Sequence, residues 1–200
     1  METIVAATMN KNKIREIEAI TGAFDFCVIT RGEARIPDID IVEDGETFEE
    51  NSLIKAREIM KLCGKTAIAD DSGVVVDALG GGPGVYSARY AGDECDDKKN
   101  RDKLLDALKD VPFEKRTAKF VSVISMVSPD GREIVARGES EGHITFEERG
   151  TGGFGYDSLF VPLGYDRTYA ELTPEEKNEI SHRANALKLL KTKIEERNDR

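Results

Sequence analysis

The sequence is poor in the residues that build disulfide frameworks and histidine-rich sites. It has no tryptophan, two histidines and three cysteines in 200 residues. Cys27, Cys63 and Cys95 lie far apart and form neither a disulfide pattern nor a CxxC metal motif. We therefore expect a reducing, cytoplasmic location. Any aromatic stacking on a ligand must come from phenylalanine or tyrosine.

The sequence also lacks long apolar runs and an excess of positive charge. No segment approaches the roughly 20 apolar residues of a membrane-spanning helix, and residues 1–5 lack the basic segment of a signal peptide. The formal net charge is −10, whereas binding to nucleic acid or anionic membranes favours a basic surface. We expect neither partner. A small anionic ligand that arrives with a divalent metal remains compatible with this charge.

The composition is that of one globular domain. Hydrophobic residues make up 39% and charged residues 34% of the chain, which is typical of a folded protein. A chain of 200 residues can form one domain with a well-buried core, or one domain of two lobes. No repeat or low-complexity linker divides the sequence, so we expect residues 1–200 to form a single domain.

Two adjacent aspartates follow a short apolar segment near the middle of the sequence. Residues 67–69 predict the end of a buried strand, and Gly73 then allows a sharp turn. Between them, Asp70, Asp71 and Ser72 place two carboxylates and a hydroxyl at a rigid position. Such carboxylates suit metal binding or general-base chemistry. Taken alone, the segment favours the alternative that all three are polar turn residues; the rest of the chain favours the site.

A strand-to-helix transition near the N-terminus resembles an anion site. Residues 3–7 predict a buried strand, and Asn10 is a plausible N-cap for a helix. Thr8, Asn10 and Lys13 therefore surround a helix N-terminus, where free amides and the helix dipole favour an anion. The alternative is an ordinary capped helix with a solvated lysine.

An acidic segment precedes the next predicted helix. Residues 37–44 read as an edge strand, and Glu43 stands just before a capping box that begins at Thr47. Asn51 and Lys55 are four residues apart and share one helix face. Periodicity does not decide whether that face points at a ligand or at water.

The C-terminal third contains a glycine-rich loop and an unusual helix start. Residues 150–155 match GxGxxG, but a strand rather than a helix is predicted next, which excludes a dinucleotide fingerprint. Phe154 and Tyr156 either clamp a flat ring or anchor the core. His182 and Arg183 occupy the first turn of the last predicted helix, where cations oppose the helix dipole. A position that breaks a local rule is a candidate functional site.

Taken together, these segments resemble the Ham1-type inosine triphosphate pyrophosphatase family. The matching segments are Thr8-x-Asn10-x-x-Lys13-x-x-Glu16, Glu43-x-Gly45-x-Thr47-Phe48-x-x-Asn51-x-x-x-Lys55-Ala56, Ala69-Asp70-Asp71-Ser72-Gly73, Gly82-Pro83-Gly84-x-x-Ser87-Ala88-Arg89-Tyr90, Gly150-Thr151-Gly152-Gly153-Phe154-Gly155-Tyr156-Asp157, Glu171-Leu172, Lys177 and Ser181-His182-Arg183. Each is weak alone, but their order along nearly the whole chain is highly specific. Ser158 departs from the proline that the family usually carries.

The resemblance implies an α/β fold that is elongated and two-lobed. A long mixed central sheet flanked by helices would form it, with the ligand in a cleft between the lobes. It also implies a homodimer that uses Mg²⁺ to hydrolyse ITP, dITP and XTP to the monophosphate and pyrophosphate. That reaction would cleanse the nucleotide pool of non-standard purines.

The resemblance also assigns roles to particular residues. Asp71 would accept the proton, and Glu43 and Asp71 would bind Mg²⁺, which takes carboxylate and phosphate oxygens. The other residues it assigns are Thr8, Asn10, Lys13, Lys55 and Ser72 for the phosphates, and Phe154, Gly155, Tyr156, Asp157, Lys177, His182 and Arg183 for the base.

Two other functions stay open at this point. A Maf-type pyrophosphatase would act on pyrimidine or modified nucleotides, but the 181–183 motif and the Phe154 loop argue against it. A nucleotide sensor without catalysis would have little use for both metal carboxylates. A pyrophosphate-release assay separates all three functions.

Overall fold

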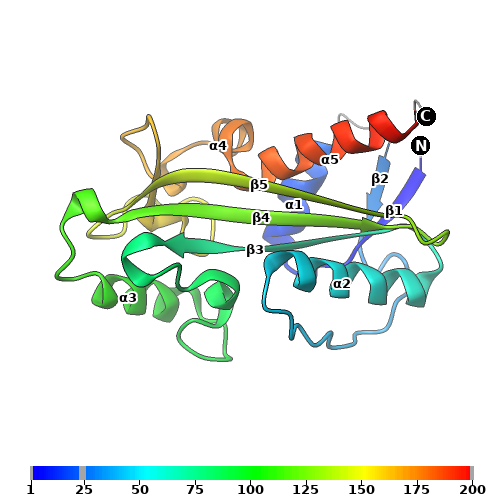
Figure 1. The fold of residues 1–200 in the computed structure, drawn as a ribbon, viewed down its shortest axis with the longest axis horizontal. Helices are drawn as coiled ribbons and strands as arrows, with labels where there is room; N and C mark the ends of the chain where they lie inside the picture. The colour runs from blue at the N-terminus through cyan, green and yellow to red at the C-terminus, as the bar shows by residue number, and fades with distance from the viewer. Residues whose placement is uncertain (1, 23–25, 199–200) are drawn as a thin grey trace. The chain divides into compact units, whose positions relative to one another are not determined.

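The structure, a computed structural model, describes residues 2–22 and 26–198. Its described residues contain a six-stranded mixed sheet with the strand order β2-β1-β3-β4-β5-β6 (Figure 1). The strands are β1 (Glu2–Ala6), β2 (Phe26–Ile29), β3 (Ala67–Val76), β4 (Thr117–Val127), β5 (Glu133–Ile144) and β6 (Phe160–Pro162). β1 pairs in parallel with β2 and β3, and β5 pairs antiparallel with β6. The predicted α/β class with a mixed, helix-flanked sheet is confirmed.

Side-chain caps fix where most of the helices begin. The helices are α1 (Lys11–Thr21), α2 (Phe48–Cys63), α3 (Asp97–Ala107), α4 (Pro174–Ile180) and α5 (His182–Asn198). Asn10 caps α1, and complete capping boxes start α2 at Thr47 and α4 at Thr173. These caps satisfy amides that have no partner inside the helix. Among the described residues, no helix has the length and apolar character needed to cross a membrane.

The chain divides into two compact units. Unit 1 comprises Met1–Asp71, Ser122–Gly138 and Arg183–Arg200, and unit 2 comprises Ser72–Val121 and Glu139–His182. Strands β3, β4 and β5 each contribute residues to both units.

Unit 1 buries both faces of its strands. Ile68 of β3 shares a buried cluster with Ile17 of α1 and Leu187 of α5. The next residue, Ala69, belongs to a second cluster with Ile59 of α2. Successive side chains of a strand point to opposite faces, so α1 and α5 cover one face and α2 the other. Figure 1 shows α2 and α5 on opposite sides of these strands.

Unit 2 has one large core. Val74 of β3, Leu104 of α3 and Phe120 of β4 are buried in it together with Phe160 and Tyr169. The buried Arg116 guanidinium donates to the carbonyls of residues 108, 111 and 145, and so ties the end of α3 to its surroundings.

Two local predictions were wrong. β3 does not end before Asp70 but runs through to Val76, because Gly73 lets the chain pass close to residues 84–87. A Cβ added at Gly73 would lie 2.4 Å from the carbonyl oxygen of Gly84. Residues 37–44 form no strand; there, Arg31 donates to the carbonyls of Pro37 and Ile39 in place of a strand partner.

Candidate functional site

The two adjacent aspartates of β3 belong to opposite faces of the sheet. Asp70 is two residues beyond Ile68 and follows its face, toward α1 and α5. Asp71 is two residues beyond Ala69 and follows the face that α2 covers. Both carboxylates are buried, with relative exposures of 1% for Asp70 and 7% for Asp71. Strand alternation therefore gives the two acids separate sets of partners.

Asp70 is the centre of a buried ion-pair network. Its Oδ2 lies 2.6 Å from Nζ of Lys13 and 3.2 Å from Nη2 of Arg183, whose Nε contacts Oδ1 at 3.2 Å. The hydroxyl of Ser122 on β4 donates to Oδ1 at 2.5 Å. Arg183 also pairs with Glu16 of α1. The network thus joins β3, β4, α1 and α5 through one carboxylate.

The charges of this network hold Asp70 and Arg183 ionised. Burial alone would raise the pKa of Asp70, but Arg183 and Lys13 outweigh it and keep the pKa well below its usual value. Burial would lower the pKa of Arg183, yet Asp70 and Glu16 raise it. Asp70 is therefore a permanent anion at neutral pH.

Asp71 belongs to a second charged cluster. Nζ of Lys55 lies 2.9 Å from Oδ1 of Asp71 and 2.8 Å from Oε2 of Glu43. The Lys55 side chain is 11% exposed and that of Glu43 is 32% exposed. One ammonium group from α2 therefore bridges two carboxylates that the sequence places 28 residues apart.

The environment of Asp71 differs from that of Asp70 in two respects. Burial raises the pKa of Asp71; Lys55 and Lys13 oppose this without cancelling it, and Glu43 adds to it. Among the described residues, Oδ2 of Asp71 is buried without a hydrogen-bond partner. A buried acceptor left unpaired is costly, so this oxygen is suited to a ligand. The raised pKa is suited to a group that takes up a proton.

The residues present fit a metal ion whose coordination is completed by substrate. No group of three or more histidine, cysteine or acidic side chains that could hold a metal ion occurs in the described part of the chain. Mg²⁺ typically takes one or two carboxylates and fills its remaining positions with water and substrate phosphates. Glu43 and the unpaired oxygen of Asp71 supply that donor set.

The loop that carries Glu43 is anchored on both sides. Oδ1 of Asn51, a residue only 1% exposed, accepts a hydrogen bond of 2.9 Å from the amide of Gly45. A Cβ at Gly45 would lie 2.8 Å from that same oxygen, which explains the glycine. Upstream, Arg31 holds the carbonyls of Pro37 and Ile39.

The N-terminus of α1 is capped from within. Oδ1 of Asn10 accepts from the amides of Asn12 and Lys13, and the Thr8 hydroxyl accepts from the amide of Asn10. The helix start that the sequence indicated is therefore confirmed. Its lysine reaches the carboxylate of Asp70 in the structure.

A second group of predicted site residues meets within unit 2. Nζ of Lys177 lies 2.6 Å from Oδ2 of Asp157 and 5.0 Å from the ring centre of Phe154. Oδ2 of Asp157 also accepts from the amide of Phe154. Lys177 and Asp157 are buried, and Phe154 is half-buried. The structure thus joins α4 to the glycine-rich loop through an ion pair.

Aromatic rings surround this pair. Nζ of Lys177 lies 5.5 Å from the ring centre of Tyr169, and the His182 ring stacks on Phe120 with centres 4.7 Å apart. Tyr156 is buried, and its hydroxyl donates to the carbonyl of Ser87. The sequence reading missed Phe120 and Tyr169, because an aromatic residue in a strand or loop gives no signal beyond that of core packing.

The other predicted site residues are Gly155 in the glycine-rich loop and Ser72 in β3. The amide of Gly155 donates to Asp97, and its carbonyl accepts from Arg101. Ser72 lies half-buried in β3. No sequence pattern assigns a role to Ser122 or Glu16, although both contact the Asp70 network.

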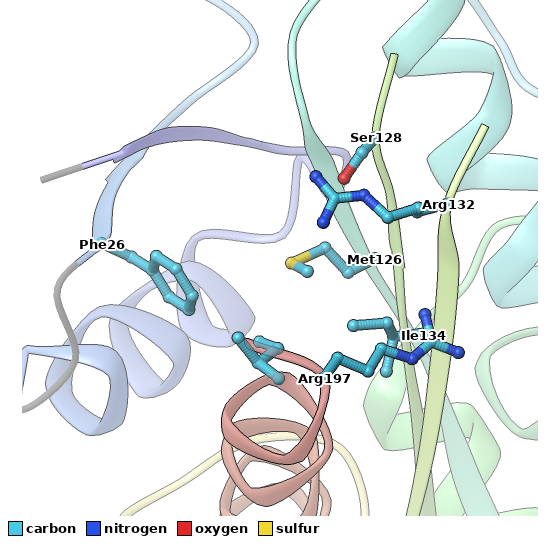
Figure 2. A pocket seen from close by; sticks show the side chains of 7 residues that line it. Phe26, Met126, Ser128, Arg132, Ile134 and Arg197 are labelled. Atoms are coloured by element: carbon cyan, nitrogen blue, oxygen red, sulfur yellow. The ribbon is translucent and has the colours of Figure 1, made fainter. Parts of the chain in front are cut away.

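A separate cavity of about 140 Å³ lies in unit 1. Figure 2 shows Phe26 facing Met126 and Ile134, with the side chains of Arg132 and Arg197 also in its wall. None of the predicted site residues lines it. The predicted site residues therefore lie outside this cavity.

Comparison with known proteins gives one consistent result. The sequence model of the Ham1 family matches residues 4–193. The dITP/XTP pyrophosphatase of Halalkalibacterium halodurans is 49% identical over 95% of this chain and 97% of its own, and that of Geobacter sulfurreducens is 50% identical over 96% of both. The solved Ham1 protein of Staphylococcus aureus superimposes with a TM-score of 0.86 at 44% identity, covering 98% of this chain and 100% of its own.

Proposed function

This chain belongs to the Ham1 family, and on that premise we propose that it is a nucleoside triphosphate pyrophosphatase. Its substrates are the non-standard purine nucleotides ITP, dITP and XTP, which it converts to the monophosphate and pyrophosphate. The relatives named dITP/XTP pyrophosphatase match almost the full length of the chain. The enzyme would remove these nucleotides from the pool.

One observation carries the proposal. Asp71 is buried beside Lys55 and Glu43, and one of its oxygens has no hydrogen-bond partner among the described residues. Burial raises the pKa of Asp71, which suits it to accept a proton from water. The oxygen of that water forms a bond to the α-phosphorus as the bond from the α-phosphorus to the bridging oxygen breaks. Pyrophosphate leaves with the bridging oxygen.

Charge neutralisation is the second requirement of this reaction. Lys13 and Lys55 supply positive charge, and Thr8, Asn10 and Ser72 supply polar contacts to the phosphates. Mg²⁺ held by Glu43 and Asp71 would neutralise the triphosphate and polarise the reacting phosphoryl group.

Base recognition falls to the second group of residues. Lys177 and His182 carry hydrogen-bond donors, which match the 6-oxo group of hypoxanthine and xanthine. Facing the 6-amino group of adenine, such donors stay unpaired, and this is heavily disfavoured. The resemblance assigns Arg183 to the base as well, but in this structure its guanidinium pairs with Asp70 and Glu16 in unit 1. Phe154 would stack on the base, and Gly155, Tyr156 and Asp157 complete this part of the site. The Lys177–Asp157 pair beside Phe154 supports the assignment.

We also propose a homodimer, as the family resemblance implies, and a cytoplasmic location, which the three scattered cysteines favour. Sedimentation equilibrium of the full chain tests the assembly and should give twice the mass of 22.1 kDa. A monomer across the micromolar range would contradict it.

The experiment that tests the activity is pyrophosphate release from ITP, dITP, XTP, GTP, ATP and dTTP, with and without Mg²⁺. We expect Mg²⁺-dependent release from the first three nucleotides. Release mainly from dTTP would favour a Maf-type enzyme. Binding of ITP without release would favour a sensor.

A matched pair of variants locates the chemistry. Asp71→Asn should abolish release while circular dichroism shows a folded protein. Asp130→Asn makes the same substitution at an acid on the exposed turn between β4 and β5, and it should keep full activity. Full activity in Asp71→Asn would remove Asp71 from the mechanism.

A further inference from the structure

Lys55 occupies a position that conflicts with a metal ion at the same carboxylates. Its ammonium group lies 2.8 Å from Oε2 of Glu43 and 2.9 Å from Oδ1 of Asp71. The proposed function assigns these two acids to the metal and Lys55 to the phosphates. The structure instead pairs Lys55 with the acids.

Coulomb repulsion makes joint occupancy unfavourable. A divalent cation shared by Glu43 and Asp71 would lie within a few ångströms of the ammonium group. Like charges at such a separation repel strongly where solvent is largely excluded, and the Lys55 side chain is only 11% exposed.

The lysine is the member of this cluster that is free to move. Asn51 holds the loop that carries Glu43 by accepting from the amide of Gly45. Asp71 is fixed in the middle of β3. Lysine has a flexible four-carbon stem and a point charge that pairs with carboxylate or phosphate alike.

We propose that Lys55 and the divalent metal compete for Glu43 and Asp71. When the triphosphate binds, the Lys55 ammonium group leaves the two carboxylates and pairs with the phosphates, and the metal can then bind the carboxylates. This exchange rests on the proposed function for the identity of the phosphate ligand. The metal then binds weakly to the free protein and strongly together with the nucleotide. Such coupling is reciprocal between the two ligands.

The proposal makes an unusual prediction for the nucleotide-free protein. Loss of Lys55 should tighten metal binding, although it removes a group of the active site. Isothermal titration of the full chain with MnCl₂ and MgCl₂ measures this directly. We expect Lys55→Met to bind Mn²⁺ at least about tenfold more tightly than the parent protein.

Three further variants make the result specific. Lys61→Met removes the same charge from α2 at an exposed position, and it should leave the metal affinity unchanged. Lys55→Gln keeps a polar side chain in case the methionine variant unfolds, and it should show the same tightening. Lys55→Met combined with Asp71→Asn should lose the tight site, which locates the metal.

Thermal unfolding gives a second readout. A ligand that binds only the folded state raises the melting temperature, and at a fixed ligand concentration the rise is larger when the dissociation constant is smaller. At one Mn²⁺ concentration, Lys55→Met and Lys55→Gln should therefore be stabilised more than the parent protein and Lys61→Met.

Unchanged or weaker Mn²⁺ binding in both Lys55 variants would overturn the proposal. If the parent protein still releases pyrophosphate, only the exchange fails and the proposed function stands. If the parent protein releases none from any nucleotide while the Lys55 variants bind Mn²⁺ more tightly, the competition at the two carboxylates stands and the proposed function fails.

Discussion

Replacement of Asp70 by asparagine isolates the charge at the centre of the buried network. The asparagine keeps nearly the same shape and still offers an oxygen to the Ser122 hydroxyl. It removes the negative charge that Lys13 and Arg183 share. Any loss of stability then reports on charge pairing and not on packing.

The expected loss is about 3 kcal/mol in the free energy of unfolding. Removal of one partner from a buried ion pair typically costs about 3–5 kcal/mol, because the other charge stays buried and uncompensated. The Arg183 side chain is only 1% exposed, but it keeps its pair with Glu16. The Lys13 side chain is 17% exposed and can regain water. Both features favour the lower end of that range.

The pH dependence gives an independent check with a defined sign. The pKa of Asp70 in the folded protein lies well below its usual value, which is about 3.9 in an unfolded chain. A lowered pKa contributes stability that is present above about pH 4 and is lost as the pH falls through the folded pKa. The free-energy difference between the parent protein and Asp70→Asn should therefore shrink as the pH falls below about 4.

Urea denaturation, followed by circular dichroism from pH 7 down to pH 3, measures both quantities. Asp130→Asn is the control, because this acid is exposed and pairs with Arg132 at the surface; its free energy of unfolding should stay close to that of the parent protein. A loss below 1 kcal/mol in Asp70→Asn at pH 7, or a difference that is the same at pH 7 and pH 3, would refute the reasoning.

Three further substitutions test the supports of the site. Asn51→Leu leaves the Gly45 amide without its acceptor. We expect the free energy of unfolding in urea to fall by about 1–3 kcal/mol and the Mg²⁺ concentration for half-maximal activity to rise. An unchanged Mg²⁺ requirement would mean that other contacts position Glu43. Asp157→Asn removes the carboxylate charge that pairs with the buried Lys177 ammonium. It should lower the free energy of unfolding by about 3 kcal/mol and raise KM for dITP more than it lowers kcat. An unchanged KM would mean that the Lys177–Asp157 pair is not part of the base site. Gly73→Ala places a Cβ 2.4 Å from a carbonyl oxygen; calorimetry should show a lower melting temperature, and an equal one would mean that the strand shifts freely.

The sequence predicted the elements that depend on local chemistry. Asn10 and Thr47 act through hydrogen bonds within four residues, so each of these helix starts follows from its own cap. The strand through Gly73 depends instead on a close approach of residues 84–87, and local turn chemistry competes with it. The irregular segment of residues 37–44 depends on hydrogen bonds from the Arg31 guanidinium to its backbone carbonyls, which no periodic sequence pattern reveals.

The order of the motifs identified the candidate residues, but it could not pair them. Lys13 with Asp70 and Lys55 with Asp71 are contacts between helices and a strand, set by packing and not by spacing. The pairing follows once β3 is known to continue past residue 69. Alternation then sends Asp70 to the face of α1 and Asp71 to the face of α2. One acid is fixed as an anion by its charged partners, and the other keeps an oxygen without a partner among the described residues. A single strand thereby separates a carboxylate that orders the fold from a carboxylate available for chemistry.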